Sequence, residues 1–296
     1  MVRLGVLKRA GGCCLIAVIT AYGAPLPQDE SSPHQIGRTT EKEIKVTLST
    51  SFGSVNISRG EPEKILVLDA DQEDSQPDKL GVEYAIRNRV GYLDLSLGRE
   101  AHDPEHKGRA VKLGVLEGGT WYLKLSDALP ISFDIELGVA KGDFDLSGLQ
   151  VKDFNLSTGA SDVNLSFREE NKSSIENLNI ESGFSKFEGH NLCNANFKRL
   201  HFQGGLGTYS LDFSGQLSSE VDVDLEVGLG VMTVYVPADV GVRVTYDKSW
   251  VSTVDCDSDF ASNGDNGYIS ENYYSAGGKI NMTISTGMGT VKIRRL

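Results

Sequence analysis

The sequence has few cysteines, few basic residues and no apolar run long enough to cross a membrane. Four of its 296 residues are cysteine, and two of these, Cys13 and Cys14, lie near the N-terminus, so a disulfide-rich scaffold is excluded. The apolar stretch from Ala10 to Ala24 is shorter than the ~18 residues that span a bilayer, and no transmembrane segment is expected. The net charge of −12 argues against nucleic acids and anionic lipid surfaces as partners.

Motifs typical of nucleophilic catalysis are also missing. The chain contains no G-x-S-x-G elbow, and its five histidines have no spacing that assembles a catalytic triad. These histidines are His34, His102, His106, His190 and His201. We therefore expect a non-enzymatic protein without a resident cofactor.

One twelve-residue pattern recurs eight times and dominates the chain. Apolar residues alternate with others on both sides of a sixth, pivot position that is usually glycine. The copies are Val46 to Ile57, Tyr84 to Leu95, Phe133 to Phe144, Phe154 to Leu165, Leu178 to Gly189, Leu200 to Leu211, Val223 to Val234 and Met282 to Ile293. Period-two alternation predicts two short strands in each copy, and the small residues between them predict a bend.

Two columns of the repeat contain no polar residue, and both are expected in the core. Three residues before the pivot stand Leu48, Ile86, Ile135, Leu156, Ile180, Phe202, Leu225 and Ile284. One residue after the pivot stand Phe52, Val90, Val139, Ala160, Phe184, Leu206, Leu229 and Met288. The next column holds only Gly, Ala or Ser, which predicts sites that admit little more than a Cβ atom.

The spacing of the repeats predicts how they assemble. Pivots from Gly138 to Gly228 are separated by 21, 24, 22 and 23 residues, so each unit adds one similar coil or hairpin. We predict an all-β, single-domain β-solenoid of repeated ~22-residue coils. An antiparallel β-sandwich of hairpins is the alternative, because alternation reports a face and not a pairing direction. A leucine-rich repeat needs a helical or 3₁₀ return segment, which these units are expected to lack.

The regions before the repeats differ in composition. Arg3, Lys8 and Arg9 precede an apolar run that ends at Ala21-Tyr22-Gly23, which predicts a signal peptide over 1–23 that is cleaved before Ala24. Residues 24–42 are polar and proline-containing, as is typical of a flexible tether. The repeat domain is expected over 43–296, with insertions at 98–119 and 247–278. The protein should therefore be exported and be periplasmic, cell-surface or extracellular.

Cleavage would leave two cysteines, Cys193 and Cys256. In an oxidising compartment they can form a disulfide, and otherwise they are two separate buried thiols. The sequence leaves both readings open.

The first insertion contains His102-Asp103-Pro104-Glu105-His106, which matches the H-x-x-E-H pattern of a zinc peptidase family. That chemistry needs both histidines on one helical face, and Pro104 disfavours a helix there. We interpret the segment as a charged loop.

The second insertion is rich in aromatic and acidic residues and is the expected binding loop. Its aromatic residues Trp250, Tyr268, Tyr273 and Tyr274 suit sugar rings or a protein partner, although they can equally cap the end of the core. Asp255, Asp257 and Asp259 resemble the opening of a calcium loop. Glycine and glutamate are missing from that loop's sixth and twelfth positions, so calcium is only an alternative.

An acidic row follows on a predicted strand. Glu220, Asp222, Asp224 and Glu226 alternate with apolar residues and should face outward. Such a row usually forms a solvated face that discourages edge pairing.

Several segments resemble a known bacterial family. Asn272 to Ala276, Lys279 to Ile293 and Ile135 to Leu149 are similar to toast-rack or adhesin-like domains, and Leu48 to Ile57 is similar to their start. The same domain resembles the soluble C-terminal half of LiaF-like proteins that respond to cell-wall-active antibiotics. The resemblance implies an all-β envelope protein and supplies no catalytic residues.

Three functional hypotheses follow. The favoured one is an exported envelope protein, structural or adhesin-like, that binds an envelope glycan or protein through the aromatic loop. The second is an envelope-stress sensor or regulator that acts through a membrane protein partner. The third is a glycan lyase or hydrolase, which would need acid pairs on neighbouring coils at positions such as Asp134 with Asn155 or Glu136 with Ser157.

Overall fold

The computed structural model describes residues 34–71, 80–97, 119–247 and 253–296. Almost all regular structure in these ranges is β-strand. The strands are β1 His34–Gly37, β2 Glu43–Arg59, β3 Lys64–Ala70, β4 Leu80–Arg87, β5 Val90–Leu97, β6 Thr120–Leu125, β7 Pro130–Asp145, β8 Gln150–Ser166, β9 Ile175–His190, β10 Phe197–Asp212, β11 Glu220–Val236, β12 Gly241–Tyr246, β13 Thr253–Cys256, β14 Phe260–Ser262, β15 Gly267–Ser270 and β16 Lys279–Arg295. One 3₁₀ turn, η2 Leu192–Ala195, follows β9. Within the described residues no helix is long and apolar enough to cross a membrane.

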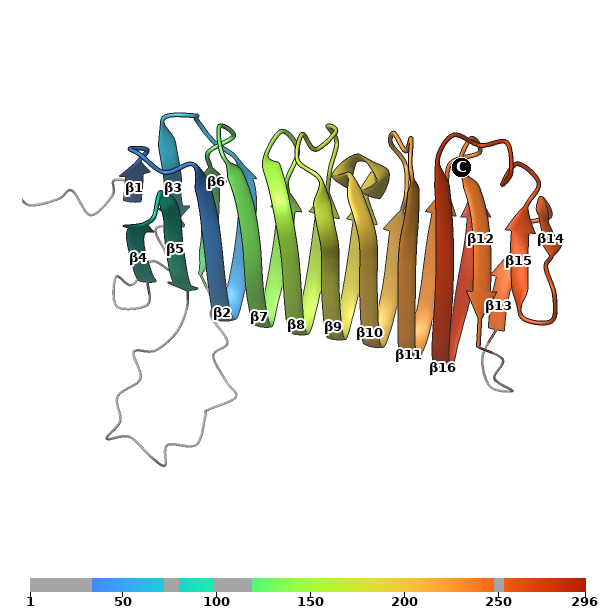
Figure 1. Ribbon diagram of the computed structural model, residues 1–296. Helices are drawn as coiled ribbons and strands as arrows, with labels where there is room; N and C mark the ends of the chain where they lie inside the picture. The colour runs from blue at the N-terminus through green and yellow to red at the C-terminus, as the bar shows by residue number, and fades with distance from the viewer. Residues whose placement is uncertain (1–33, 72–79, 98–118, 248–252) are drawn as a thin grey trace, which may run out of the picture. The chain divides into compact units, whose positions relative to one another are not determined.

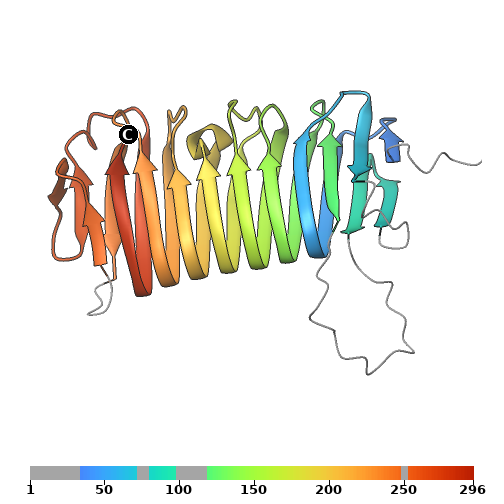
Figure 2. The ribbon, with the colours of Figure 1, turned by 180° about the vertical axis from the view of Figure 1, so that it is seen from behind.

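The long strands form one large, largely parallel sheet. Strands β2, β7, β8, β9, β10, β11 and β16 pair in that order, each parallel to the next. Each strand bends near its middle, so its first half lies on one side of the stack and its second half on the other (Figure 1). The second halves are seen from behind in Figure 2. The antiparallel alternative is therefore wrong for this central stack.

The shorter strands extend both ends of the stack. At the N-terminal end, β5 pairs with the first half of β2 and β6 with its second half. At the C-terminal end, β12 and β13 pair in the same way with β16. The antiparallel strands β15 and β14 follow β12 outward. The 247–278 insertion thus contributes three short strands to this end, whereas the 98–118 segment lies outside the described residues.

Seven of the eight repeats are single bent strands. The prediction that the eighth copy forms a coil of the same kind is wrong. The copy from Tyr84 to Leu95 is instead an antiparallel hairpin of β4 and β5. Its turn residues Asn88 and Arg89 have φ of 51° and 64°, the left-handed backbone of a tight two-residue hairpin. The repeat pattern predicted a bend here where the chain forms a tight turn, because a bend and a turn interrupt the alternation in the same way.

The core lies between the two halves of the bent strands. In β7, Phe133 and Ile135 from the first half and Phe144 from the second half are at most 1% exposed. The rings of Phe187, Phe202 and Tyr209 form a cluster, with centroid distances of 5.2 Å and 5.1 Å from Phe202 to its two neighbours. Large side chains from successive coils therefore fill one continuous core.

Buried asparagines hold the turns that connect the coils. Asn171 Oδ1 accepts a bond from the backbone N–H of Val151 at 2.9 Å, and its Nδ2 donates to the carbonyls of Val151 and Ala195 at 2.7 and 3.0 Å. Asn194, within η2, donates to the Phe167 carbonyl at 2.9 Å. The expectation that no unit has a 3₁₀ return segment was wrong at this turn, where η2 presents Asn194 to the neighbouring coil.

Candidate binding groove

The column that follows each pivot is exposed, in contrast to its predicted place in the core. Val139, Phe184, Leu206, Leu229 and Met288 are 47, 66, 43, 42 and 59% exposed. Phe52 and Ala160 complete the column and are half-buried. These seven residues stand in register on successive coils. They form an apolar ladder along the edge where the strands bend.

The bend shifts the alternation by one residue and thereby exposes the ladder. In β7 the buried residues before the pivot are Phe133, Ile135 and Leu137, whereas after it they are Ala140 and Phe144. Val139 continues the first series, but in the second half that series is the outward one and includes the exposed Lys141 and Asp143, so Val139 points outward. The apolar positions on the two sides of each pivot differ by an odd number of residues, which agrees with this shift, but the pattern alone did not show which apolar column stays exposed.

Close backbone contact between coils explains the glycine at the pivot. A Cβ atom added to Gly205 would lie 2.7 Å from the carbonyl oxygen of Gly183, and one on Gly183 would lie 2.8 Å from that of Gly159. Real Cβ atoms essentially never approach this closely. Successive coils therefore stack directly through their backbones at the bend.

A groove of about 880 Å³ runs along this edge. Its floor is the small-residue column, Gly53, Ala140, Ser161, Ser185, Gly207 and Gly230. One wall is the apolar ladder from Phe52 to Leu229, and the other is Ser54, Lys141, Asp162, Lys186 and Thr208. Seven rungs at ~4.8 Å spacing make the ladder about 29 Å long. The groove thus offers a long apolar strip beside a polar one.

Charge is concentrated in the polar wall near β7, β8 and β9. Lys141, Asp162 and Lys186 stand on successive rungs of that wall. Lys186 Nζ forms an ion pair with Glu188 Oε1 at 3.0 Å, and this carboxylate raises the pKa of Lys186. Asp162 is the single carboxylate among the groove-lining residues, and none of them is a histidine or cysteine.

The predicted aromatic binding residues lie elsewhere, at the C-terminal end of the stack. Tyr273 is 4% exposed, its ring packs under the Arg243 guanidinium at 4.3 Å, and its hydroxyl donates to Asn281 Oδ1 at 2.8 Å. Tyr268 stacks on Tyr246 with ring centroids 5.7 Å apart. Tyr274 is 80% exposed, and Trp250 lies outside the described residues. Tyr268 and Tyr273 thus help to cover the end of the core.

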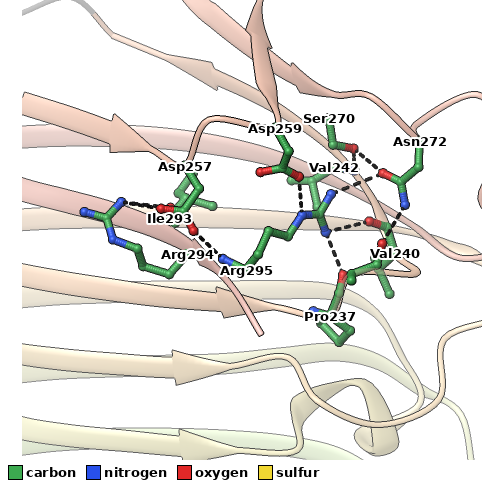
Figure 3. A network of polar contacts seen from close by, with 11 residues as sticks. Pro237, Val240, Val242, Asp257, Asp259, Ser270, Asn272, Ile293, Arg294 and Arg295 are labelled. Carbon is green, nitrogen blue, oxygen red and sulfur yellow. Dashed lines mark hydrogen bonds and ion pairs between the residues drawn. The ribbon is translucent and has the colours of Figure 1, made fainter.

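Two arginines engage the three aspartates proposed for calcium, and Figure 3 shows the contacts of Asp257 and Asp259. Arg294 Nη2 lies 2.5 Å from Asp255 Oδ2, and Arg294 Nη1 lies 3.5 Å from Asp257 Oδ1. Arg295 Nε donates to Asp259 Oδ2 at 2.7 Å. Within the described ranges no three acidic, histidine or cysteine side chains are grouped to hold a metal ion. The arginines at the end of β16 therefore neutralise these carboxylates.

Arg295 is the centre of this network. Its Nη1 donates to the carbonyls of Pro237 and Val240 at 2.6 and 2.9 Å, and its Nη2 donates to Asn272 Oδ1 at 3.2 Å (Figure 3). Only 14% of the side chain is exposed. The guanidinium thereby joins β16, the β11–β12 turn and the insertion.

Replacing Arg295 with alanine should lower the free energy of unfolding by about 2 kcal/mol, because several acceptors lose a charged donor. Urea unfolding would measure the loss, and hydrogen exchange should accelerate first in β13 to β15. Arg295→Lys keeps the charge without the forked geometry and should recover only part of the stability. Arg199→Ala, which removes a 53% exposed arginine from an ion pair with Glu176, should change stability by about 0.5 kcal/mol or less. Equal losses in Arg295→Ala and Arg199→Ala would contradict the role of this network.

The remaining candidates are distributed as follows. His102 to His106 lie outside the described residues. The acidic row of β11 faces outward, as predicted: Glu220, Asp222, Asp224 and Glu226 are exposed. On β7 and β8, Asp134 pairs with Asn155 and Glu136 with Ser157, so the expected neighbours are adjacent but contain no acid pair.

The two cysteines are free thiols and form no disulfide in the structure. Cys193 is buried within η2, and Cys256 is half-buried on β13. Burial raises the pKa of each thiol to about 12. Burial thus favours the protonated thiol over the nucleophilic thiolate at both positions.

The fold defines a class of repeat-built, largely parallel β protein with an exposed apolar groove along the bend. Residues 26–190 match the N-terminal domain of toast_rack, and the chain belongs to this family. Residues 189–293 match the C-terminal domain of LiaF-like cell wall-active antibiotics response proteins. The comparison with curated proteins found no match for this chain.

Several solved structures are similar to the chain. A candidate cell adhesion protein from Clostridium sporogenes is 21% identical, with a TM-score of 0.42, and the match covers 90% of this chain and 100% of that one. A candidate adhesin from Bacteroides fragilis is 12% identical with a TM-score of 0.31, covering 89% of this chain and 98% of that one. A candidate adhesin from Parabacteroides merdae is 10% identical with a TM-score of 0.22, covering 88% and 95%.

Proposed function

We propose that this protein is an exported, non-enzymatic β-solenoid of the cell envelope that binds an envelope component through the groove at its bend. The predicted signal peptide supports export, and the periplasm, the cell surface and the medium are all compatible with it. The observation that carries the proposal is the apolar ladder, whose side chains stay exposed on successive coils while their neighbours are buried. The proposed binding surface is therefore the groove at the bend, in place of the aromatic loop that the sequence analysis favoured.

The composition of the ladder supports binding on physical grounds. The largest contiguous apolar patch on a monomeric soluble protein often marks an interaction site, and patches larger than a few hundred Å² are uncommon. Covering Phe184 and its neighbours Leu206 and Leu229 would remove apolar area from water at ~25 cal/mol per Å². The stacked backbones beneath them hold the strip straight, so that binding would cost little conformational freedom in the protein.

Exchanging the groove residues Phe184 and Leu206 for asparagine should strongly weaken binding to the envelope. The purified protein is expected to sediment with insoluble envelope material, and the double variant should lose most of this binding, at least about tenfold in affinity. Both side chains are exposed, so their replacement should leave the fold intact. Sedimentation followed by quantification of bound and free protein measures the effect.

Ile86→Asn is the matched control, because Ile86 is a 39% exposed apolar residue on β4, outside the groove. It should bind like the unchanged protein. Equal sedimentation of the groove variant and the unchanged protein would contradict the assignment of the groove. Release of soluble sugar during the incubation would instead support the lyase or hydrolase hypothesis.

A regulatory role in the envelope-stress response is the second candidate. The match of residues 189–293 to the LiaF-like C-terminal domain favours it. Deleting the gene should then change the transcriptional response of the host cell to a cell-wall-active antibiotic. An unchanged response would exclude this role and leave the binding function in place.

A further inference from the structure

We infer that two copies of this chain associate through the groove, with antiparallel stacks and a two-fold axis that lies in the interface between the β8 and β9 rungs. Each ladder then lies on the ladder of the other copy, and each column faces the same column of the partner in reverse order. The inference goes beyond the proposed function: the dimer is a state of the free protein, and only the monomer offers the groove to an envelope component. It follows from the order of side-chain sizes and of charges along the rungs.

The sizes of the ladder residues are complementary about this axis. Phe184 on β9 is the most exposed of them, at 66%, and Ala160 on β8 is the smallest. They stand on adjacent rungs, so the axis places each Phe184 over the partner's Ala160. The other facing ladder pairs are Val139 with Leu206 and Phe52 with Leu229. A large ring above a small residue on both sides of the axis lets the two ladders approach closely.

The charges of the polar wall are complementary about the same axis. Asp162 and Lys186 stand on the two rungs beside the axis, so each carboxylate faces the partner's ammonium group. Lys186 also pairs with Glu188 in its own copy, and an ammonium group carries three donors, which is enough for both carboxylates. The other facing pairs of this wall are Lys141 with Thr208 and Ser54 with Val231. Opposite charges that meet across an interface fix its register.

Acidic side chains outnumber basic ones around the groove, but this axis brings no two of them face to face. In the column beyond the polar wall, Glu188 faces Asn164 and Asp143 faces Ser210. On the other side of the ladder the facing pairs are Ser157 with Glu181, Glu136 with Gln203 and Ser49 with Glu226. The net charge of −12 on each copy opposes association, but physiological salt screens charges that are more than ~8 Å apart.

Other placements of the axis lose this match. With the axis on the Phe184 rung, Lys186 would face its own symmetry mate, and with the axis on the Ala160 rung, Asp162 would face its own mate. Like charges in direct opposition are destabilising. Two copies with parallel stacks would set the most exposed ring, Phe184, against its own mate. The antiparallel arrangement about the β8–β9 position avoids all three conflicts.

The facing strip is long but narrow. It spans six rungs, from β2 to β11 in the order of pairing, or about 24 Å at ~4.8 Å per rung. One ladder with its two flanking columns then buries on the order of 1,000 Å² over both copies, at the low end of specific interfaces. We therefore expect a weak dimer, with a Kd on the order of 10 µM.

The test is sedimentation-velocity ultracentrifugation of the purified protein from about 1 to 200 µM, a range that brackets this affinity. The protein should change from monomer to dimer across the range. Ala160→Phe adds exposed apolar surface but fills the space that the partner's Phe184 needs, so it should weaken the dimer at least about tenfold. Non-specific apolar association would instead become stronger in this variant. Ile86→Asn, which changes an exposed apolar residue outside the groove, should leave the affinity unchanged.

A charge reversal tests the facing ion pair. Asp162→Lys places two ammonium groups opposite each other and should weaken the dimer at least about tenfold. The double variant Asp162→Lys, Lys186→Asp exchanges the two charges and should recover most of the affinity. A double variant as weak as Asp162→Lys alone would overturn the inferred register.

The remaining outcomes separate the dimer from the proposed function. A protein that stays monomeric throughout the range, or an Ala160→Phe dimer as tight as that of the unchanged protein, would overturn the inference. Sedimentation of such a monomer with envelope material would leave the proposed function standing. A dimer with the expected response to Ala160→Phe that does not sediment with envelope material would support the inference and overturn the proposed function.

Discussion

Replacing Phe202 with alanine should lower the free energy of unfolding by about 3–5 kcal/mol, the usual cost of removing a fully buried phenylalanine ring. Phe202 is 0% exposed and lies in β10, in the middle of the stack. Its ring contacts those of Phe187 on the preceding coil and Tyr209 in the second half of its own strand. Stacked backbones hold both neighbours in place, so the cavity cannot collapse easily.

Urea unfolding followed by circular dichroism would measure this loss. Phe184→Ala is the matched control, because it makes the same change at a ring that is 66% exposed. It should change stability by about 1 kcal/mol or less while weakening binding in the groove. Similar losses in the two variants would mean that the ring of Phe202 is not part of a tightly packed core.

Replacing Gly230 with alanine should destabilise the protein by about 3 kcal/mol or more, from backbone strain and overpacking together. A Cβ atom at this position would lie 2.0 Å from the carbonyl oxygen of Gly207. Gly230 also has a φ of +149°, which L side chains rarely adopt. The neighbouring coils would have to separate to admit even one methyl group, and that separation would weaken the core on both sides.

Two glycine variants separate the causes. Gly264 has a φ of +76°, and a Cβ atom added there would have no atom within 4 Å. Gly264→Ala should therefore show only the backbone strain of this φ, about 1 kcal/mol. Gly277 has open space around it and no unusual φ, so Gly277→Ala should leave the stability nearly unchanged. Thermal unfolding of the three variants provides the comparison. A Gly230→Ala loss no larger than that of Gly264→Ala would show that the coils are not in close backbone contact.

Much of the fold could be predicted from the repeat. The alternation in copies such as Phe133 to Phe144 predicted strands, and the small residues predicted a bend, because both depend on local backbone geometry. The pairing of Asp134 with Asn155 followed from aligning the repeats. The hairpin at Arg89 was missed because a turn interrupts the alternation in the same way as a bend. The 3₁₀ turn at η2 was missed because four residues are too few to show a period.

The candidate site was harder to predict than the fold. Tyr268, Tyr273 and the aspartates were chosen because aromatic and acidic residues in a long loop are typical of binding. Their structural partners, Tyr246 and Arg295, are separated from them in sequence; Arg295 and Asp259, for example, are 36 positions apart. No local pattern reports such a pair. The groove was overlooked because its residues are apolar and were assigned to the core.

The sequence by itself determined that the chain forms strands of similar length interrupted by bends, since alternation and small pivot residues act within each unit. It left the pairing direction of these strands open, and the tertiary structure shows that they pair in parallel. Only the tertiary structure decided which apolar residues remain outside. Whether Val139 or Phe184 is buried depends on a one-residue shift at the bend and on backbone contact between neighbouring coils. Exposure is a property of the stack, because a residue becomes buried only when another coil or the opposite half covers it.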